Sequence, residues 1–365
     1  MTSLSCGIVG LPNVGKSTLF NALTAAKAEA ANYPFCTIDP NVGRVPVPDK
    51  RLQALSDQSD SKKIIPAIME FVDIAGLVEG ASQGEGLGNK FLANIRETDA
   101  IVEVVRCFED PDVVHVKGKV DPIKDIETIN VELVLFDLEM LESALPRVEK
   151  QSKGKNDAVL TIATMKKAIA HLNEEKPLRS LVLTPEEKES IKAYNFLTSK
   201  KVLYVCNVAD SDLPLMENDF VKQVRDYAQK EGNTVITVCA KLEAEISQLD
   251  PADRKAFLND MGLELSGLDR LIKTSFEMLG LITFITTGEI ETRAWTIKQG
   301  MNAQEAAGKI HTDIQKGFVR AEVVSYNDMM KLGGRVKARE AGKARSEGKE
   351  YIVHDGDVIL FMHHG

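Results

Sequence analysis

The stretch GLPNVGKST, at residues 10–18, decides the fold of this chain. It matches the pattern GxxxxGK(S/T), whose glycines let the backbone curl so that successive N–H groups point at phosphate oxygens. An apolar run at residues 4–9 precedes it and predicts a buried strand, whereas residues 16–28 predict a helix. A loop between a strand and a helix start is the context that this pattern requires. The sequence therefore predicts a site for a nucleoside triphosphate.

Four residues of this loop have defined tasks in phosphate binding. Gly10 and Gly15 permit the tight backbone path. The Lys16 ammonium reaches the β- and γ-phosphates, and the Ser17 hydroxyl is placed to ligate Mg²⁺. The alternative is a glycine-containing turn without a ligand, which the complete pattern in this context disfavours.

The whole chain has the composition of a soluble globular protein. Its 365 residues exceed one ordinary core, so two or three domains are expected. The longest apolar runs, such as residues 279–285, are too short to span a membrane, and no basic segment followed by an apolar one begins the chain. Five scattered cysteines favour a reducing compartment over a disulfide framework. These features predict a cytoplasmic protein with no membrane partner.

The charge of the chain limits its expected contacts with nucleic acid. A net charge of −9 argues against general affinity, so we expect no DNA partner. Contact with RNA requires a local basic patch, and residues 331–350 hold seven basic and three acidic residues. A solvated loop rich in glycine, lysine and arginine is the other explanation of this composition.

Apolar segments typical of strands alternate with helical ones in two parts of the chain. This alternation predicts an α/β fold with crossover units and a mostly parallel sheet. The predicted segments are residues 4–9, 16–28, 68–72, 87–98, 101–107, 201–206, 220–231, 234–238 and 269–279. We assign residues 1–123 and 200–280 to one nucleotide-binding domain.

The region between these two parts has a helical periodicity instead. Apolar residues recur at three- and four-residue steps over residues 126–148 and again over 159–172. The pattern predicts two helices that fold back as an antiparallel, coiled-coil hairpin, and a threonine, proline and glutamate at 184–187 predict the start of a third. Residues 124–199 are therefore predicted to be a helical insertion. Short β-branched runs after it predict a C-terminal α+β module at 281–365.

Later motifs indicate a switch-type site and not only a phosphate loop. An apolar strand ends in Asp73, which in such sites holds Mg²⁺ from the far side, usually through water. The N–H of Gly76 then senses the γ-phosphate, and Thr37 completes the Mg²⁺ shell when triphosphate is bound. A single Asp or Thr in a loop has no such meaning, so the order of the motifs carries this prediction.

Two loops follow consecutive predicted strands in the order of the base-reading loops of GTPase-like proteins. The first holds Asn207 and Asp210, and the second is Cys-Ala-Lys at 239–241. The usual guanine-reading pattern is Asn-Lys-x-Asp, in which the lysine packs over the base and the aspartate accepts two hydrogen bonds from guanine. Val208 replaces that lysine, so we expect a weaker preference for guanine.

The ordered motifs resemble those of the YchF, or Obg-like ATPase, family of P-loop proteins related to translation factors. Besides the phosphate loop, the similarity rests on NYPFCT at 32–37, on FVDIAGLVEGASQGEGLGNKFL at 71–92, and on the order of the base loop, the insertion and the C-terminal module. The resemblance implies a GTPase-like fold, binding and hydrolysis of ATP in preference to GTP, and a C-terminal TGS domain. It also implies a link to the ribosome and to stress responses.

The resemblance also assigns roles to residues. By position, phosphate binding falls to Asn13, Val14, Gly15, Lys16, Ser17 and Thr18. The resemblance assigns Ser17 and Thr37 as Mg²⁺ ligands, and Asn207 and Val208 as contacts of the base. The family usually has glutamate where this chain has Asp210, the residue type that reads guanine. We expect ATP, with GTP as the alternative that Asp210 favours.

The catalytic group for hydrolysis differs from that of Ras-like enzymes, in which a glutamine beside the switch glycine orients water. Leu77 occupies that place and cannot do so. His115 is our candidate, because a neutral imidazole orients water or accepts a proton near pH 7, and it resembles the histidine on a mobile segment that the family is thought to use. A solvated or packed histidine is the alternative. Arg96 and Arg106 either neutralise charge in the transition state or form surface ion pairs.

Three classes of function follow from these motifs. The first is an Mg²⁺-dependent ATPase, with Lys16 and His115 as catalytic residues, that associates with the ribosome or RNA as a regulator of translation or stress response. The second is a GTP-binding switch, and the third is an RNA-binding module with a structural nucleotide. Base preference separates the first two, and phosphate release separates both from the third.

Overall fold

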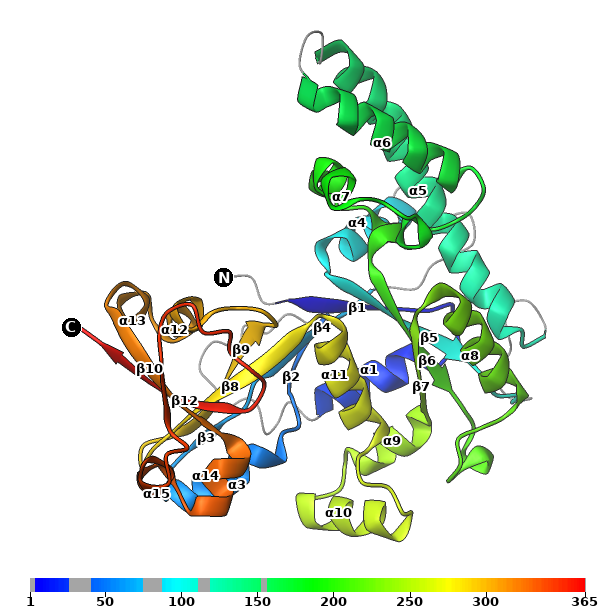
Figure 1. Cartoon of the computed structure of the whole chain (residues 1–365). Coiled ribbons are helices and arrows are strands. Elements are labelled where there is room, and N and C mark those ends of the chain that lie inside the picture. The colour runs from blue at the N-terminus through cyan, green and yellow to red at the C-terminus, as the bar shows by residue number, and fades with distance from the viewer. Residues whose placement is uncertain (1–3, 26–40, 75–86, 111–118, 152–155, 365) are drawn as a thin grey trace. The chain divides into compact units, whose positions relative to one another are not determined.

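Figure 1 shows the computed structural model of the chain, which describes residues 4–25, 41–74, 87–110, 119–151 and 156–364. The described residues form two compact units. The first contains the described residues up to Gly43 together with Glu70–Leu271, and the second contains Arg44–Met69 and the described residues from Ile272 onward. The strands form two six-stranded sheets.

The first sheet has the strand order β2-β4-β1-β5-β6-β7. Its members are β2 (Val42–Pro46), β4 (Ile68–Asp73), β1 (Ser5–Val9), β5 (Ala100–Arg106), β6 (Lys201–Asn207) and β7 (Thr234–Val238). β1 pairs in parallel with β4 and β5, and β6 and β7 continue the parallel array. β1 and β5 are buried along their whole length, which explains their continuous apolar sequences. The loops that follow these parallel strands meet at one edge of the sheet, where α/β proteins bind ligands.

The helices of this unit begin and end where the sequence supplies caps. For α8 (Asp219–Glu231), the Asn218 side chain accepts from the N–H of Val221, and Gly232 ends the helix at a φ of 71°. The other helices outside the insertion are α1 (Lys16–Ala25), α4 (Leu87–Glu97), α9 (Ala240–Ile246), α10 (Pro251–Asp260) and α11 (Gly267–Met278), which continues into the second unit. The predicted α/β fold with a mostly parallel sheet is therefore confirmed.

The helical insertion contains a hairpin of α5 (Pro122–Gln151) and α6 (Asn156–Leu172), which lie side by side in Figure 1. Leu141 and Met165 are fully buried in the apolar cluster that these helices share. At the start of α7 (Pro185–Ile191), Thr184 and Glu187 form the predicted capping box. The short 3₁₀ turns are η1 (Leu178–Ser180), η2 (Lys192–Tyr194), η3 (Leu197–Ser199) and η4 (Asp210–Asp212), the last of which lies in the base loop.

Polar contacts join the end of the insertion to α4. The Lys200 ammonium, which is almost fully buried, contacts the carbonyl oxygen of Thr98, just after the helix ends. The Asn195 amide donates to the carbonyl oxygen of Arg96 at 2.8 Å. These donors satisfy carbonyl groups that have no partner within the helix. A cation at the C-terminal end of a helix also interacts favourably with the helix dipole.

The second sheet has the order β11-β10-β12-β8-β9-β3. Its strands are β3 (Ile64–Ile65), β8 (Leu281–Thr287), β9 (Thr292–Lys298), β10 (Phe318–Ser325), β11 (Arg345–Glu347) and β12 (Asp357–His363). Its helices are α3 (Lys50–Ser59), α12 (Ala303–Ile310), α13 (Thr312–Lys316), α14 (Tyr326–Leu332) and α15 (Arg335–Glu340). Phe284 and Ile297 are buried in its core together with alanines of α12. This mixed architecture agrees with the α+β module expected from residue 281.

One segment belongs to a different unit from the one that the sequence suggested. The sequence predicts residues 44–69 in the nucleotide-binding domain, but they cluster with the second unit, although their two ends complete β2 and β4 of the first sheet. Strand β3 pairs in parallel with β9, and the Arg51 guanidinium donates to Asp355 at 2.8 Å. The reason is a pairing between segments that lie far apart in the chain, which no local pattern announces. The polar helix α3 was missed for the same reason, since among its contacts are β8, β9 and α14, which lie far along the chain.

Two further features of the described residues concern the helices and the cysteines. None of the described helices is long and apolar enough to cross a membrane. Cys6, Cys107, Cys206 and Cys239 are buried free thiols, and buried cysteines pack as small apolar residues.

Candidate nucleotide-binding site

The phosphate loop joins β1 to α1 along a backbone path that few residue types adopt. Asn13 and Gly15 have φ values of 63° and 94°, in the left-handed region that favours glycine and asparagine. A Cβ on Gly10 would lie 2.9 Å from the carbonyl oxygen of Val104 in the neighbouring strand β5. A Cβ on Gly15 would collide with the Asn207 amide. Backbone conformation and packing therefore both require the glycines of this loop.

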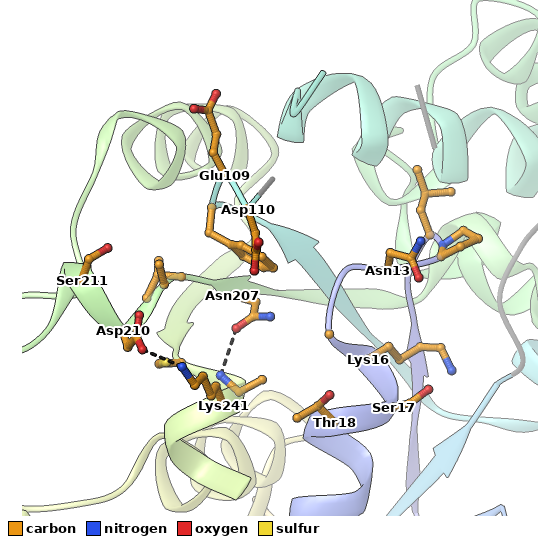
Figure 2. Close-up of a pocket in the computed structure, with 18 of the residues that line it drawn as sticks. Asn13, Lys16, Ser17, Thr18, Glu109, Asp110, Asn207, Asp210, Ser211 and Lys241 are labelled. Atoms are coloured by element: carbon orange, nitrogen blue, oxygen red, sulfur yellow. Dashed lines mark hydrogen bonds and ion pairs between the residues drawn. The ribbon is translucent and has the colours of Figure 1, made fainter. Parts of the chain in front are cut away.

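The charged groups of the site lie where this loop enters α1. The Lys16 ammonium forms an ion pair with the Asp73 carboxylate, and their side chains are 10% and 23% exposed. The pairing of β1 with β4 sets Asp73 beside Ile8, so this carboxylate stands next to the loop. Ser17 and Thr18 line the same cavity from the first turn of α1, close to Lys16 in Figure 2. An ammonium and a helix N-terminus suit phosphate, and the oxygens of Ser17 and Asp73 are the hard ligands that Mg²⁺ prefers.

The Asn207 side chain connects the phosphate loop to the second base loop. It is buried at 4% exposure at the end of β6. Its amide nitrogen donates to the carbonyl oxygen of Val14 at 2.9 Å, and its oxygen accepts from the N–H of Ala240 at 2.9 Å. Figure 2 shows the second of these bonds. Asn207, predicted to contact the base, thus also holds two loops of the site at a fixed separation.

The other residues of the base loop differ in exposure. Val208 is buried at 3% exposure and lines the cavity, and its N–H donates to the carbonyl oxygen of Val238. Asp210 is exposed and accepts from the Lys241 ammonium at 2.8 Å, across the two base loops (Figure 2). This contact lowers the pKa of Asp210 and raises the pKa of Lys241. Asp210 is therefore a carboxylate acceptor at the base end of the cavity.

The phosphate loop, Asp73 and the two base loops line one cavity of about 960 Å³, within the range of small-molecule sites. Besides Ser211, which adjoins Asp210 in the base loop, three lining residues were not anticipated: Phe108, Glu109 and Asp110, in the loop after β5. They belong to no short motif. Their position directly after a predicted strand of the parallel sheet was the available signal, because such loops gather at the ligand-binding edge.

Several predicted residues fall elsewhere. Thr37, Gly76, Leu77 and His115 lie outside the described residues. Arg96 belongs to the last turn of α4, where its guanidinium donates to the carbonyl oxygen of Tyr194, and it does not line the cavity. The expectation of a surface ion pair is wrong for Arg106, which is only 2% exposed. It lies at the end of β5, where its guanidinium packs against the Phe108 ring.

These features define a P-loop nucleoside-triphosphate-binding protein. A glycine loop joins a central parallel strand to a helix that begins with a lysine. A carboxylate ends the neighbouring strand, and the base loops follow the next two strands of the sheet. Two family models match the chain. One, described as a 50S ribosome-binding GTPase, matches residues 5–137, and the YchF-type GTPase C-terminal model, described as a protein of unknown function, matches residues 281–364.

Similarity to individual proteins extends over nearly the whole chain. The sequence is 55% identical over 361 residues to the ribosome-binding ATPase YchF of Bacillus subtilis, which covers 98% of this chain and 99% of that protein. It is 53% identical over 358 residues to the ribosome-binding ATPase YchF of Escherichia coli O157:H7, covering 98% of each. The solved structure of the Schizosaccharomyces pombe YchF GTPase has a TM-score of 0.89 and 36% identity, over 99% of this chain and 98% of that one. The chain belongs to the YchF family, as its motifs suggested.

Proposed function

We propose that this protein binds ATP with Mg²⁺, hydrolyses it to ADP and phosphate, and associates with the ribosome. The observation that carries the proposal is the cavity in which the phosphate loop, Lys16, Asp73 and both base loops converge. Curated relatives that are 55% and 53% identical over nearly the full length are named ribosome-binding ATPases, which supports the same activity here.

The roles within the phosphate end follow from the geometry of the loop. In this proposal the backbone N–H groups of residues 13–18 and the N-terminus of α1 bind the phosphates, and the Lys16 ammonium neutralises the β- and γ-phosphate charge. To serve the phosphates, this ammonium must exchange its bond to Asp73 for bonds to phosphate oxygens. Ser17, Asp73 and Thr37 are the proposed holders of Mg²⁺, which when bound neutralises charge on the transferred phosphoryl group.

The attacking water requires a group that orients it, and we assign this role to His115. Leu77 offers no polar atom in the place of the Ras-type glutamine. His115 follows shortly after the cavity-lining residues 108–110 in the chain. Turnover by His115→Ala at saturating ATP tests the assignment, and a rate equal to that of the unaltered protein removes it.

The choice of base is the point on which two functions compete. Val208 takes away the lysine that would pack over guanine, which favours ATP. Asp210 retains a carboxylate of the guanine-reading type, and the S. pombe relative is titled a GTPase, so a GTP-binding switch is the second candidate. Calorimetric titration with ATPγS and GTPγS decides between them. We expect tighter binding of the adenine nucleotide, and the reverse order would establish the switch.

Hydrolysis itself is tested by phosphate release at a fixed ATP concentration. We expect Lys16→Ala to lose turnover, because the ammonium that the phosphate loop supplies to the phosphates is then missing. Lys230→Ala, an exposed lysine on α8, is the matched control and keeps the full rate. Tight nucleotide binding without any phosphate release would indicate the third class, an RNA-binding module with a structural nucleotide.

For the ribosome we propose contact through the insertion and the C-terminal module, whose residues 281–365 we assign as a TGS domain in a cytoplasmic protein. The basic segment 331–350 is less available than its composition indicates. Arg335 and Arg339 donate to Glu322, and Arg345 donates to Tyr351. The four lysines of the segment, Lys331, Lys337, Lys343 and Lys349, are exposed and are the proposed RNA contacts. Co-sedimentation with ribosomal subunits, with and without nucleotide, tests the association, and changing all four lysines to glutamine tests the surface.

A further inference from the structure

Arg106 is a buried cation that the roles assigned above do not use. It is the last residue of β5 and is only 2% exposed. It lies opposite Asn207 in the pairing of β5 with β6, so it belongs to the edge of the sheet at which the nucleotide cavity opens. Arg106 itself does not line that cavity. An effect of Arg106 on the nucleotide must therefore pass through another residue.

The contacts of its side chain point to Phe108. The Arg106 Nε donates to the carbonyl oxygen of Phe108 at 3.2 Å. The guanidinium carbon lies 4.6 Å from the centre of the Phe108 ring, within the range of a cation–π contact. One guanidinium thus holds both the backbone and the ring of a residue that lines the cavity.

The neighbouring backbone is fixed from the other side. The N–H of Cys107 donates to the carbonyl oxygen of Asn207 at 2.8 Å, and the Asn218 amide donates to the carbonyl oxygen of Cys107 at 2.8 Å. Burial lowers the pKa of Arg106, while the carboxylates of Asp110 and Asp125 oppose this effect. The guanidinium stays charged, since arginine remains protonated in proteins.

We propose that Arg106 is a positioning residue that holds Phe108 as an aromatic wall at the base end of the nucleotide cavity. Phe108 lines this cavity together with Val208 and Asp210. Stacking on a phenyl ring is worth a similar amount for every base, so Arg106 sets affinity for purine nucleotides without selecting among them. The inference rests on the proposed function only in taking this cavity as the nucleotide site.

A double-mutant cycle on the full chain tests the proposal, with ADP and GDP as probes in calorimetric titrations. We expect Arg106→Met and Phe108→Leu each to weaken both nucleotides about tenfold, with an unchanged ratio of ADP to GDP affinity. The double variant should also be weakened about tenfold instead of a hundredfold, because Arg106 acts through Phe108. In turnover assays the KM for ATP should rise with kcat unchanged.

Arg179→Met is the matched control. The Arg179 side chain is 8% exposed and donates to Asn130 in the same unit, but it does not line the cavity. We expect this variant to lose thermal stability and to keep its nucleotide affinity, which separates positioning from general destabilisation.

Three results overturn the inference: unchanged affinity in Arg106→Met, losses that add in the double variant, or unchanged affinity in Phe108→Leu. The last variant alters a half-buried loop residue and keeps the test decisive if Arg106→Met fails to fold. Failure of the proposed function looks different, because the unaltered protein would then bind neither ADP nor GDP.

Discussion

Removal of the Asn207 amide should destabilise the first unit as well as weaken nucleotide binding. In Asn207→Ala the Val14 carbonyl oxygen loses its donor and the Ala240 N–H loses its acceptor, each from a bond of 2.9 Å. A buried polar group left without its partner costs about 1–3 kcal/mol. With two such groups, and with water able to enter from the cavity, we expect a loss of about 2–4 kcal/mol in the free energy of unfolding.

Urea unfolding measures this loss, and the chain provides an internal reference. Its single tryptophan, Trp295, lies in the second unit, so tryptophan fluorescence follows that unit while circular dichroism follows both. We expect Asn207→Ala to lower the unfolding midpoint of the transition seen by circular dichroism alone. The fluorescence transition should not move.

Asn173→Ala is the control for this prediction. Asn173 is an exposed residue just after α6, and such surface changes fall within about 0.5 kcal/mol. If the free energy of unfolding of Asn207→Ala matches that of this control, the two hydrogen bonds do not hold the loops together and the reasoning fails. In Asn207→Ala the nucleotide affinity must fall together with the free energy of unfolding, because Asn207 joins the phosphate loop to the base loop.

Three further predictions address the site and the second unit. Gly15→Ala should fold but bind ADP at least tenfold more weakly, because the added methyl group displaces Asn207 and strains a backbone at φ 94°. Calorimetric titration measures the ADP affinity, and a normal affinity would refute the packing argument. Lys241→Ala should release Asp210 and shift preference toward GDP, as measured by the ratio of ADP to GDP affinity, which must stay constant if the ion pair is irrelevant. The second unit should lose stability as pH falls, because the Arg339 and Arg335 guanidinium groups lower the pKa of Glu322. A depressed pKa contributes stability that is fully present above the ordinary glutamate pKa and is lost as pH falls through the folded-state pKa. The fall in the Trp295 fluorescence midpoint between pH 6 and pH 3 should be smaller in Glu322→Gln, and an equal fall in both proteins would contradict the linkage.

The parts of the fold that could be predicted are those with local causes. A run of apolar residues before GLPNVGKST is enough to place β1 and α1, since the loop geometry follows from its glycines. The capping box at Thr184 was predictable in the same way, because it involves two residues three apart in the chain. Local rules therefore reached the central strands of the first sheet, the helices of the hairpin and the position of the phosphate loop.

The parts that could not be predicted depend on distant contacts. Nothing in residues 50–65 shows that α3 and β3 join the C-terminal sheet. Their partner β9 is more than 200 residues further along the chain, after the residues of the first unit. Phe108 follows a strand without any motif, so its place in the cavity becomes visible only when the strands are ordered. The side-chain direction of Asn207 also depends on packing, which is why its bracing of two loops was missed.

The membership of residues 44–69 in the second unit has a consequence for the order in which this chain folds during synthesis. α3 and β3 leave the ribosome early, but β8, β9 and β12 are made only near the end of translation. At a translation rate of about 5–20 residues per second, the apolar face of α3 is synthesised about 10–60 s before the strands that cover it. The N-terminal part of the chain therefore cannot complete its structure until translation has nearly finished. A nascent chain arrested near residue 270 would expose Leu52 and Leu55, which the finished protein buries, and would be a natural target for chaperones.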